Sequence, residues 1–314
     1  MVDNRKQWKA WLYLSPAIIL LLVFTVWPII NTLAMAFQNG YSANQAKAGA
    51  TFAFGIANFK KVIGYKRFIT CLSNTMLLCV ATVPISTILA LLIAVALNSI
   101  KWLRKGLQTV FFLPYVTNSI AIGMVFAAMF NVIGYRMVGG VATADSWGIV
   151  NNVIMFFGGN PISWINQSSS YWANIVVMVV YIVWNALPFK ILVLLGGLQS
   201  VNKQYYEAAR VDGTPRHRVL TKITVPLLSP MIAYVVITGF IGGFKEYSSI
   251  VGIFGDTMGP VHDSGRLNTM VGFIYDALGT NAHGTASAAA LILFLIILVV
   301  TMINLWVSKK RVHY

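Results

Sequence analysis

The sequence contains few charged residues: Asp, Glu, Lys and Arg make up 10% of its 314 positions, against about 25% in an average soluble domain. Hydrophobic residues make up 58%, and the mean hydropathy is +0.74. A soluble fold of this length cannot bury so much apolar surface. The same composition excludes a disordered chain, a collagen-like chain and a disulfide scaffold. The sequence therefore predicts an integral membrane protein.

Acidic residues and cysteines are scarce as well. There are 8 acidic residues against 23 basic ones, so the formal net charge is +15. On a soluble chain this excess would suggest nucleic acid, but here the basic residues flank apolar runs, where they set membrane topology. No nucleic-acid partner is expected. The two cysteines, Cys71 and Cys79, would stand about 12 Å apart on one helix, too far for a disulfide.

Several chemical motifs are absent. The chain has no Gly-Lys pair and hence no P-loop for ATP, no GxSxG nucleophile elbow, and four scattered histidines without metal-ligand spacing. We therefore expect no metal site, no cofactor in this chain and no enzymatic activity. Ion-coupled carriers usually place ionisable groups inside the membrane. Here Lys245 and Glu246 form the one charged pair expected near a span interior, which disfavours an ion-coupled secondary transporter.

Six apolar runs are long enough to cross a bilayer, for which a helix needs about 20 residues. They cover roughly 11–37, 71–97, 107–135, 171–189, 227–244 and 285–307. The first run is longer than the apolar part of a signal peptide, so we interpret it as a membrane span. The predicted fold class is all-α: a polytopic membrane protein with about six transmembrane helices.

The distribution of Lys and Arg predicts that both termini are cytoplasmic. In that orientation most basic residues lie inside, in four groups. These groups are Arg5, Lys6 and Lys9; Lys101, Arg104 and Lys105; Lys203, Arg210, Arg216, Arg218 and Lys222; and Lys309, Lys310 and Arg311. The first outer loop also carries basic residues, and we interpret 58–67 as a surface helix. The predicted organisation is a cytoplasmic N-terminus (1–10), a first span (11–37), an external loop (38–70), a five-helix core (71–307) and a cytoplasmic C-terminus (308–314).

The segment after the fourth span predicts two short helices. Residues 203–211 form the first, and Asp212-Gly213 ends it because glycine tolerates the left-handed conformation of a helix end. Thr214 is expected to cap the second helix, with Pro215 at its first position. This helix should run to about Ile223 and stop at Pro226. The charges alone are also compatible with a basic amphipathic helix lying on the lipid surface.

The residue string in this segment resembles the EAA loop of the permease subunits of ABC importers. The matching residues are Glu207, Ala208, Ala209, Asp212, Gly213, Ile223 and Pro226. Thr214, Leu220 and Val225 are mild departures from the usual pattern. The resemblance extends over most of the chain, including Phe112-Leu113-Pro114 and the turn at 255–260. It is to the carbohydrate-uptake branch, similar to the permeases of maltose, multiple-sugar and glycerol-phosphate systems.

The resemblance implies a division of labour between subunits. A second permease, expected to be a different chain, would complete the pore, and an extracytoplasmic solute-binding protein would deliver the substrate. Two ATPase subunits would bind ATP and Mg and receive the coupling loop, 199–226. Glu207, Ala208, Ala209, Asp212, Gly213 and Pro226 are the expected coupling residues. The chain would reside in the cytoplasmic (inner) membrane of a bacterium or archaeon.

The resemblance also suggests residues along the substrate path. Two segments resemble those that contact sugar in maltose-type permeases, and they contain Trp184, Asn185, Phe189, Lys245, Glu246 and Tyr247. Aromatic faces and amide or carboxylate groups suit sugar rings, and a midplane site suits alternating access. Helix–helix hydrogen bonding and an internal Lys245–Glu246 ion pair are the structural alternatives. An ABC permease for another solute class, such as a glycerol-phosphate ester, remains an alternative to a sugar permease.

Overall fold

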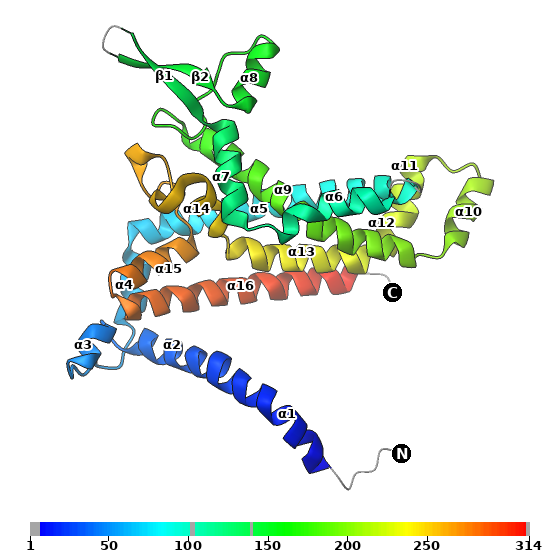
Figure 1. Ribbon diagram of the computed structural model, residues 1–314. Helices are drawn as coiled ribbons and strands as arrows, with labels where there is room; N and C mark the ends of the chain where they lie inside the picture. Colours follow the sequence, from blue (N-terminus) through cyan, green and yellow to red (C-terminus); the bar gives the residue numbers. More distant parts are fainter. Residues whose placement is uncertain (1–6, 101–103, 139–140, 312–314) are drawn as a thin grey trace. The chain divides into compact units, whose positions relative to one another are not determined.

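The structure is a computed structural model that describes residues 7–100, 104–138 and 141–311 (Figure 1). Arg5, Lys6 and Lys101, which contribute to the orientation argument, lie outside the described residues. So do the outermost parts of the two expected cytoplasmic ends, 1–6 and 312–314. The chain divides into two compact units. Unit 1 comprises Met1–Ile69 and Phe273–Phe294, and unit 2 comprises Thr70–Gly272 and Leu295–Tyr314.

Unit 1 begins with one long apolar helix. It is built from α1 (Gln7–Leu21), the π-helical turn η2 (Leu22–Val26) and α2 (Trp27–Phe37). The π turn precedes Pro28, which lacks an N–H, so the widened turn accommodates a residue that cannot continue the regular hydrogen-bond ladder. The most apolar part of this helix is not buried by the described chain, as expected for a helix that faces lipid.

The remainder of unit 1 contains three short helices and parts of two long ones. These are α3 (Ala43–Lys47), α4 (Ala57–Gly64), most of α15 (Met270–Gly279), and the beginnings of α5 (Lys66–Ser99) and α16 (His283–Arg311). Asn58 is only 2% exposed. Its Nδ2 donates to the carbonyl oxygens of Ala36 and Gln38, at 3.0 and 2.7 Å. This buried amide ties α4 to the end of α2.

The surface helix expected over 58–67 is present, but it is shorter than predicted. One face of α4 is buried, and the helix ends at Gly64 because Tyr65 adopts an extended conformation. Lys66 and Arg67 instead begin α5. The Arg67 guanidinium lies 2.8 Å from a carboxylate oxygen of Asp276, so part of the positive charge of this loop is neutralised.

Unit 2 contains the remaining elements. They are α6 (Arg104–Val116), α7 (Ser119–Phe130), β1 (Val132–Val138), β2 (Val141–Trp147), α8 (Ile149–Phe156), α9 (Tyr171–Ser200), α10 (Lys203–Val211), α11 (Arg216–Val219), η3 (Leu220–Thr224), α12 (Val225–Leu227), α13 (Ser229–Phe244), α14 (Ser248–Phe254), η4 (Gly255–Thr257) and η5 (Val261–Asp263). Helices α5, α9 and α13 share one apolar cluster, and α9 and α14 contribute to a second. Cys71 and Cys79 are buried and form no disulfide with each other.

The described residues contain four helices long and apolar enough to span a membrane, or up to six if each bent pair counts as one span. The four are Trp8–Phe37, Lys66–Ser99, Tyr171–Ser200 and His283–Lys309. The bent pairs are α6 with α7, and the helix Arg216–Leu227 with α13, with angles of 106° and 71°. These segments correspond to the six expected runs, and the chain is a multi-pass, mainly helical membrane protein.

The third span expected over 107–135 is interrupted, and its helical part ends earlier than predicted. Residues Thr117 and Asn118 interrupt it, and the Asn118 side chain accepts a hydrogen bond from the Ile120 N–H at 2.9 Å, which caps a new helix. Pro114 lies just before the break and has no N–H to continue the helix. Helix α7 then ends at Phe130. The next residues form an antiparallel β-hairpin, β1 with β2, which the all-helical prediction missed.

Candidate functional site

The segment between α9 and α13 forms the expected pair of short helices. Helix α10 covers the predicted residues, Lys203–Val211. Asn202 caps it by accepting a hydrogen bond from the Gln204 N–H at 3.0 Å. Gly213 has a φ of 65°, in the left-handed region that favours glycine. The Gly213 and Thr214 N–H groups bond to the carbonyl oxygens of Arg210 and Ala209, so the helix end is satisfied as in a Schellman-type cap.

Two details of the second helix differ from the prediction. Pro215, with extended backbone, occupies the cap position expected for Thr214, and α11 begins at Arg216. Pro226 does not stop the helix, which continues to Leu227. The π turn η3 immediately precedes it and provides the slack that a proline without an N–H requires. The chain bends at Leu228 instead.

Exposure divides the six expected coupling residues into two sets. Ala209 is buried and Pro226 is partly buried. The other four residues are exposed: Glu207, Ala208, Asp212 and Gly213. Glu207 takes part in none of the ion pairs formed by the described residues, so it is not neutralised by Lys203 or Arg210. The exposed side of this loop therefore presents the Glu207 carboxylate, which is in no ion pair of the described residues, and the small residues Ala208 and Gly213, which another protein could approach closely.

A second feature is a cavity of about 300 Å³ inside unit 2. It lies between α5, α6, α9 and α13, and its residues on α5 and α9 come from the middle of each helix. Its polar and aromatic lining consists of Thr82, Ser86, Tyr115, Asn185, Phe189, Lys190, Thr238 and Glu246. Glycine allows α13 to pack closely against α5, because a Cβ on Gly243 would lie 2.7 Å from the Cys79 sulfur.

Three of the six expected path residues line this mid-span cavity: Asn185, Phe189 and Glu246. The other three do not. The Trp184 ring packs on Phe126, with centroids 5.0 Å apart, Tyr247 packs against the core, and Lys245 is exposed.

The Lys245–Glu246 ion pair is not among those of the described residues. Instead, one Glu246 carboxylate oxygen accepts hydrogen bonds from the Tyr247 and Ser249 N–H groups, both at 3.1 Å. Glu246 therefore holds the start of α14, because a carboxylate is favourable at a helix N-terminus.

Lys190 is the site residue that the sequence prediction missed. It is 4% exposed, and its Nζ donates to Ser86 Oγ at 2.6 Å, to Thr87 Oγ1 at 3.0 Å and to the Val83 carbonyl at 3.2 Å. The prediction ended the fourth span at Phe189 and left Lys190 at its edge. Helix α9 continues to Ser200, which places this lysine inside the span. A single cation within a 30-residue apolar run was the available signal.

Comparisons with known proteins agree with this architecture. The family described as "Binding-protein-dependent transport system inner membrane component" matches residues 71–313. The chain is 29% identical to the lactose transport system permease protein of Rhizobium radiobacter, over 94% of this chain and 91% of that protein. It is also 29% identical to the arabinooligosaccharides transport system permease protein of Bacillus subtilis, over 96% and 89%.

A third relative and a solved structure extend the comparison. The trehalose/maltose transport system permease protein of Thermococcus litoralis is 26% identical over 98% of this chain and 96% of its own length. The fold is similar to a chain in the crystal structure of a bacterial ABC transporter that imports the acidic polysaccharide alginate. That similarity has a TM-score of 0.76 at 21% identity and covers 98% of this chain and 97% of the other. The chain belongs to the family of binding-protein-dependent transport system inner membrane components.

Proposed function

We propose that this chain is the transmembrane permease subunit of an ATP-driven, binding-protein-dependent importer of a sugar or oligosaccharide. The observation that carries the proposal is the similarity to lactose, arabinooligosaccharide and trehalose/maltose permeases over 94%, 96% and 98% of the chain. Membership in the family establishes a transport component rather than an enzyme. ATP hydrolysis is assigned by this proposal to separate ATPase subunits.

The mid-span cavity suits the proposed substrate. Its lining combines the Asn185 amide, the hydroxyl groups of Thr82 and Thr238, and the rings of Tyr115 and Phe189. Such a mixture of a few polar groups on an apolar, aromatic wall is typical of small-molecule sites. Its place halfway along α5 and α9 is where alternating access requires a site.

The alternative of a phosphate-ester substrate receives less support from the cavity. An anionic solute needs cationic donors that are free to bind it, whereas Lys190 donates to three protein acceptors. Glu246 also lines the cavity and would repel a second anion. The lining therefore favours a neutral solute.

The loop 199–226 is the proposed contact with two ATPase subunits, which would bind ATP and Mg. Glu207 would pair with a basic group of an ATPase, and the exposed Ala208 would allow close approach. The buried Ala209 would act by keeping α10 packed on this chain, and Gly213 would allow the sharp reversal between α10 and α11. This assignment places both termini in the cytoplasm, in the cytoplasmic (inner) membrane of a bacterium or archaeon. A second permease chain and an extracytoplasmic solute-binding protein would complete the complex.

The test is uptake by the complete transporter in proteoliposomes, with the solute-binding protein outside and ATP inside. Labelled lactose, maltose, trehalose and arabinotriose are the probes. We expect at least one sugar to accumulate only with hydrolysable ATP and with the binding protein, and to do so in the presence of proton and sodium ionophores. Uptake that ionophores abolish while ATP is present would indicate an ion-coupled carrier. Uptake of glycerol phosphate but of no sugar would indicate the other solute class.

A further inference from the structure

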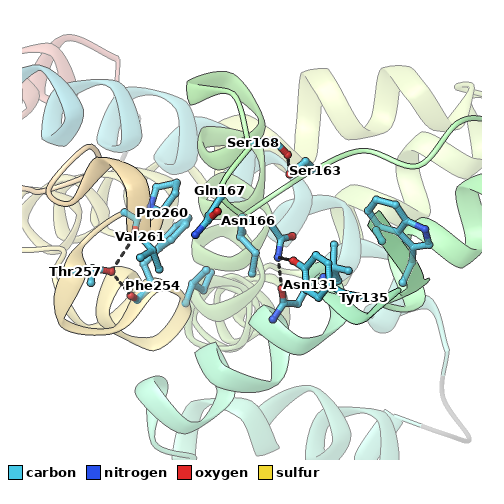
Figure 2. A pocket seen from close by; sticks show the side chains of 16 residues that line it. Asn131, Tyr135, Ser163, Asn166, Gln167, Ser168, Phe254, Thr257, Pro260 and Val261 are labelled. Atoms are coloured by element: carbon cyan, nitrogen blue, oxygen red, sulfur yellow. Dashed lines mark hydrogen bonds between the residues drawn. The ribbon is translucent and has the colours of Figure 1, made fainter. Parts of the chain in front are cut away.

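Unit 2 contains a second, larger cavity of about 780 Å³ (Figure 2). Three segments form its wall: the β1–β2 hairpin, residues 163–168 before α9, and the end of α14 with the loop to Val261. Figure 2 shows Asn131 and Tyr135 on one side, Phe254, Thr257 and Pro260 on the other, and Gln167 between them. The volume lies within the range of about 300–1,000 Å³ found for small-molecule sites.

The lining of this cavity carries no Asp, Glu, Lys, Arg or His among the described residues. It offers amide groups from Asn131, Asn166 and Gln167, and aromatic rings from Tyr135 and Trp147. Amides and hydroxyls both donate and accept hydrogen bonds, and an aromatic ring offers a flat apolar face. This combination matches a neutral, polyhydroxylated ligand, and, unlike the mid-span cavity, it includes no charged side chain among the described residues.

A hydrogen-bond network fixes one wall and leaves an acceptor without a donor. Asn131 Oδ1 accepts from the Val132 N–H at 2.9 Å, which fixes the orientation of that amide. Asn166 must therefore present its Nδ2 to the same oxygen, at 2.6 Å, and this Nδ2 also reaches the Tyr135 hydroxyl at 3.3 Å. Asn166 Oδ1 is left buried with no donor in the described part of the chain. A ligand hydroxyl that reached this oxygen would supply the missing donor.

The opposite wall is held in place independently of any ligand. The Thr257 hydroxyl hydrogen-bonds to the carbonyl oxygens of Phe254 and Gly259, at 2.7 and 2.8 Å. Arg266, farther along the same loop, donates to the Ser169 carbonyl oxygen at 2.8 Å and so joins this loop to the segment before α9. The cavity is therefore preformed rather than dependent on closure of a loose loop.

The two cavities and the loop 199–226 lie in order along α9. The large cavity includes Ser168, just before the helix begins at Tyr171. The mid-span cavity includes Asn185 and Lys190, and the loop follows the end of the helix at Ser200. A helix of 30 residues is about 45 Å long. The large cavity thus lies at the end of α9 opposite the proposed ATPase contact, which is the side from which substrate would arrive.

From this geometry and chemistry we propose that the large cavity is an outer binding subsite for a neutral sugar unit, occupied before the sugar enters the mid-span cavity. Gln167 is the proposed hydrogen-bonding residue at its centre, and Tyr135 and Trp147 supply the ring faces. The proposal rests on the proposed function, since it takes the imported solute to be a sugar.

The test measures sugar binding to the complete transporter in nanodiscs, without the solute-binding protein, by equilibrium dialysis of labelled lactose, maltose and trehalose. Asn185→Trp fills the mid-span cavity, so that binding in this background reports the outer subsite. Adding Gln167→Trp should weaken the remaining binding at least tenfold. Adding Asn160→Trp, a matched change on an exposed residue of the same outer segment but outside the cavity, should leave binding within twofold.

Three results would overturn the proposal: no binding to the unmodified transporter, complete loss of binding with Asn185→Trp alone, or full retention with Asn185→Trp and Gln167→Trp together. Should Asn185→Trp prevent assembly, the single variants Gln167→Trp and Asn160→Trp are compared in ATP-driven uptake, where only the former should slow import.

A further measurement separates a sugar from a protein ligand. If Gln167→Trp weakens docking of the sugar-free solute-binding protein as much as docking of the loaded one, the cavity receives polypeptide, and the subsite assignment fails. Absence of ATP-driven uptake of any sugar by the unmodified complex would instead count against the proposed function, independently of these binding results.

Discussion

Lys190 illustrates how a charged residue is accommodated inside a membrane span. Removing an ammonium group from water costs several kcal/mol, so its three hydrogen bonds are needed. Ser86 and Thr87 are suited to accept two of the three, because their hydroxyl hydrogens bond to the Thr82 and Val83 carbonyl oxygens of their own helix, at 2.6 and 2.7 Å. Their lone pairs are thereby directed to Lys190, which joins α9 to α5.

This arrangement predicts that two substitutions of Lys190 change the stability of the protein by different amounts. Lys190→Met keeps most of the side-chain volume, and both hydroxyls retain their own partners, so the stability change should stay within about 1 kcal/mol. Lys190→Ala also leaves a cavity and should cost about 2 kcal/mol or more. Thermal unfolding of the purified transporter in detergent measures both, with Lys60→Met on the surface as the control. A loss for Lys190→Met equal to that for Lys190→Ala would show that the ammonium itself stabilises the structure.

At the level of single residues, the predicted substrate path shares three of its six residues with the lining of the mid-span cavity. Asn185 and Phe189 line the mid-span cavity from α9, and Glu246 lines it from the short connection between α13 and α14. Lys190 was missed because the end of an apolar run was judged locally, by the first charged residue. Its partners are more than 100 residues away in sequence, and only the packing of α5 against α9 reveals them. Long-range contacts of this kind are not visible in a residue string.

At the level of elements, the helices that were predicted correctly are those whose ends are set by neighbouring residues, and the elements that were missed depend on features that the local sequence does not show. Helix α10 was predicted with its bounds because Asp212-Gly213 ends it locally, and Gly213 adopts the expected left-handed conformation. The β-hairpin was missed because it continues an apolar run, and short apolar segments do not distinguish strand from helix. Pro226 was misread as a stop because a π turn, which compensates for proline, has no sequence signature.

The crossing of α7 with α14 provides a prediction at this scale. A Cβ on Gly123 would lie 2.6 Å from the Gly252 Cα, a backbone atom that cannot move aside cheaply. Gly123→Ala should therefore destabilise the protein by about 1–3 kcal/mol, since overpacking outweighs the gain in helix propensity. Gly196→Ala, on α9 with no atom within 4 Å, is the matched control and should raise the unfolding temperature slightly. The opposite order of the two unfolding temperatures would contradict the packing seen between α7 and α14.

Gly213 provides a second prediction, which depends on the proposed coupling role. A Cβ there meets no atom within 4 Å, so any penalty comes from its positive φ. Asparagine tolerates this conformation, whereas a β-branched residue does not. Gly213→Val should lower co-purification of the ATPase subunits and ATP-driven uptake at least tenfold, and Gly213→Asn should retain most of both. Normal co-purification of ATPase with Gly213→Val would remove the conformational role assigned to this glycine.

At the level of the whole molecule, composition and the apolar runs predicted a multi-pass helical membrane protein. Six apolar runs predicted the spans because the length of a membrane-crossing helix is set by the bilayer and needs no tertiary information. The structure adds that two of the six runs form bent helix pairs, with breaks at Asn118 and Leu228, and that each counts as a span only if its two helices are taken together. The orientation of these spans remains a prediction from the basic residues.

That orientation predicts which engineered thiols a membrane-impermeant maleimide reaches in intact spheroplasts. Cys71 and Cys79 are buried, so background labelling should be low. Asn160→Cys lies in an exposed segment between α8 and α9, on the predicted outer side, and should be labelled fully. Lys309→Cys, exposed near the end of α16, is on the predicted cytoplasmic side and should react only after permeabilisation. Labelling of Lys309→Cys but not Asn160→Cys before permeabilisation would reverse the topology, and with it the sides assigned to the outer cavity and the coupling loop.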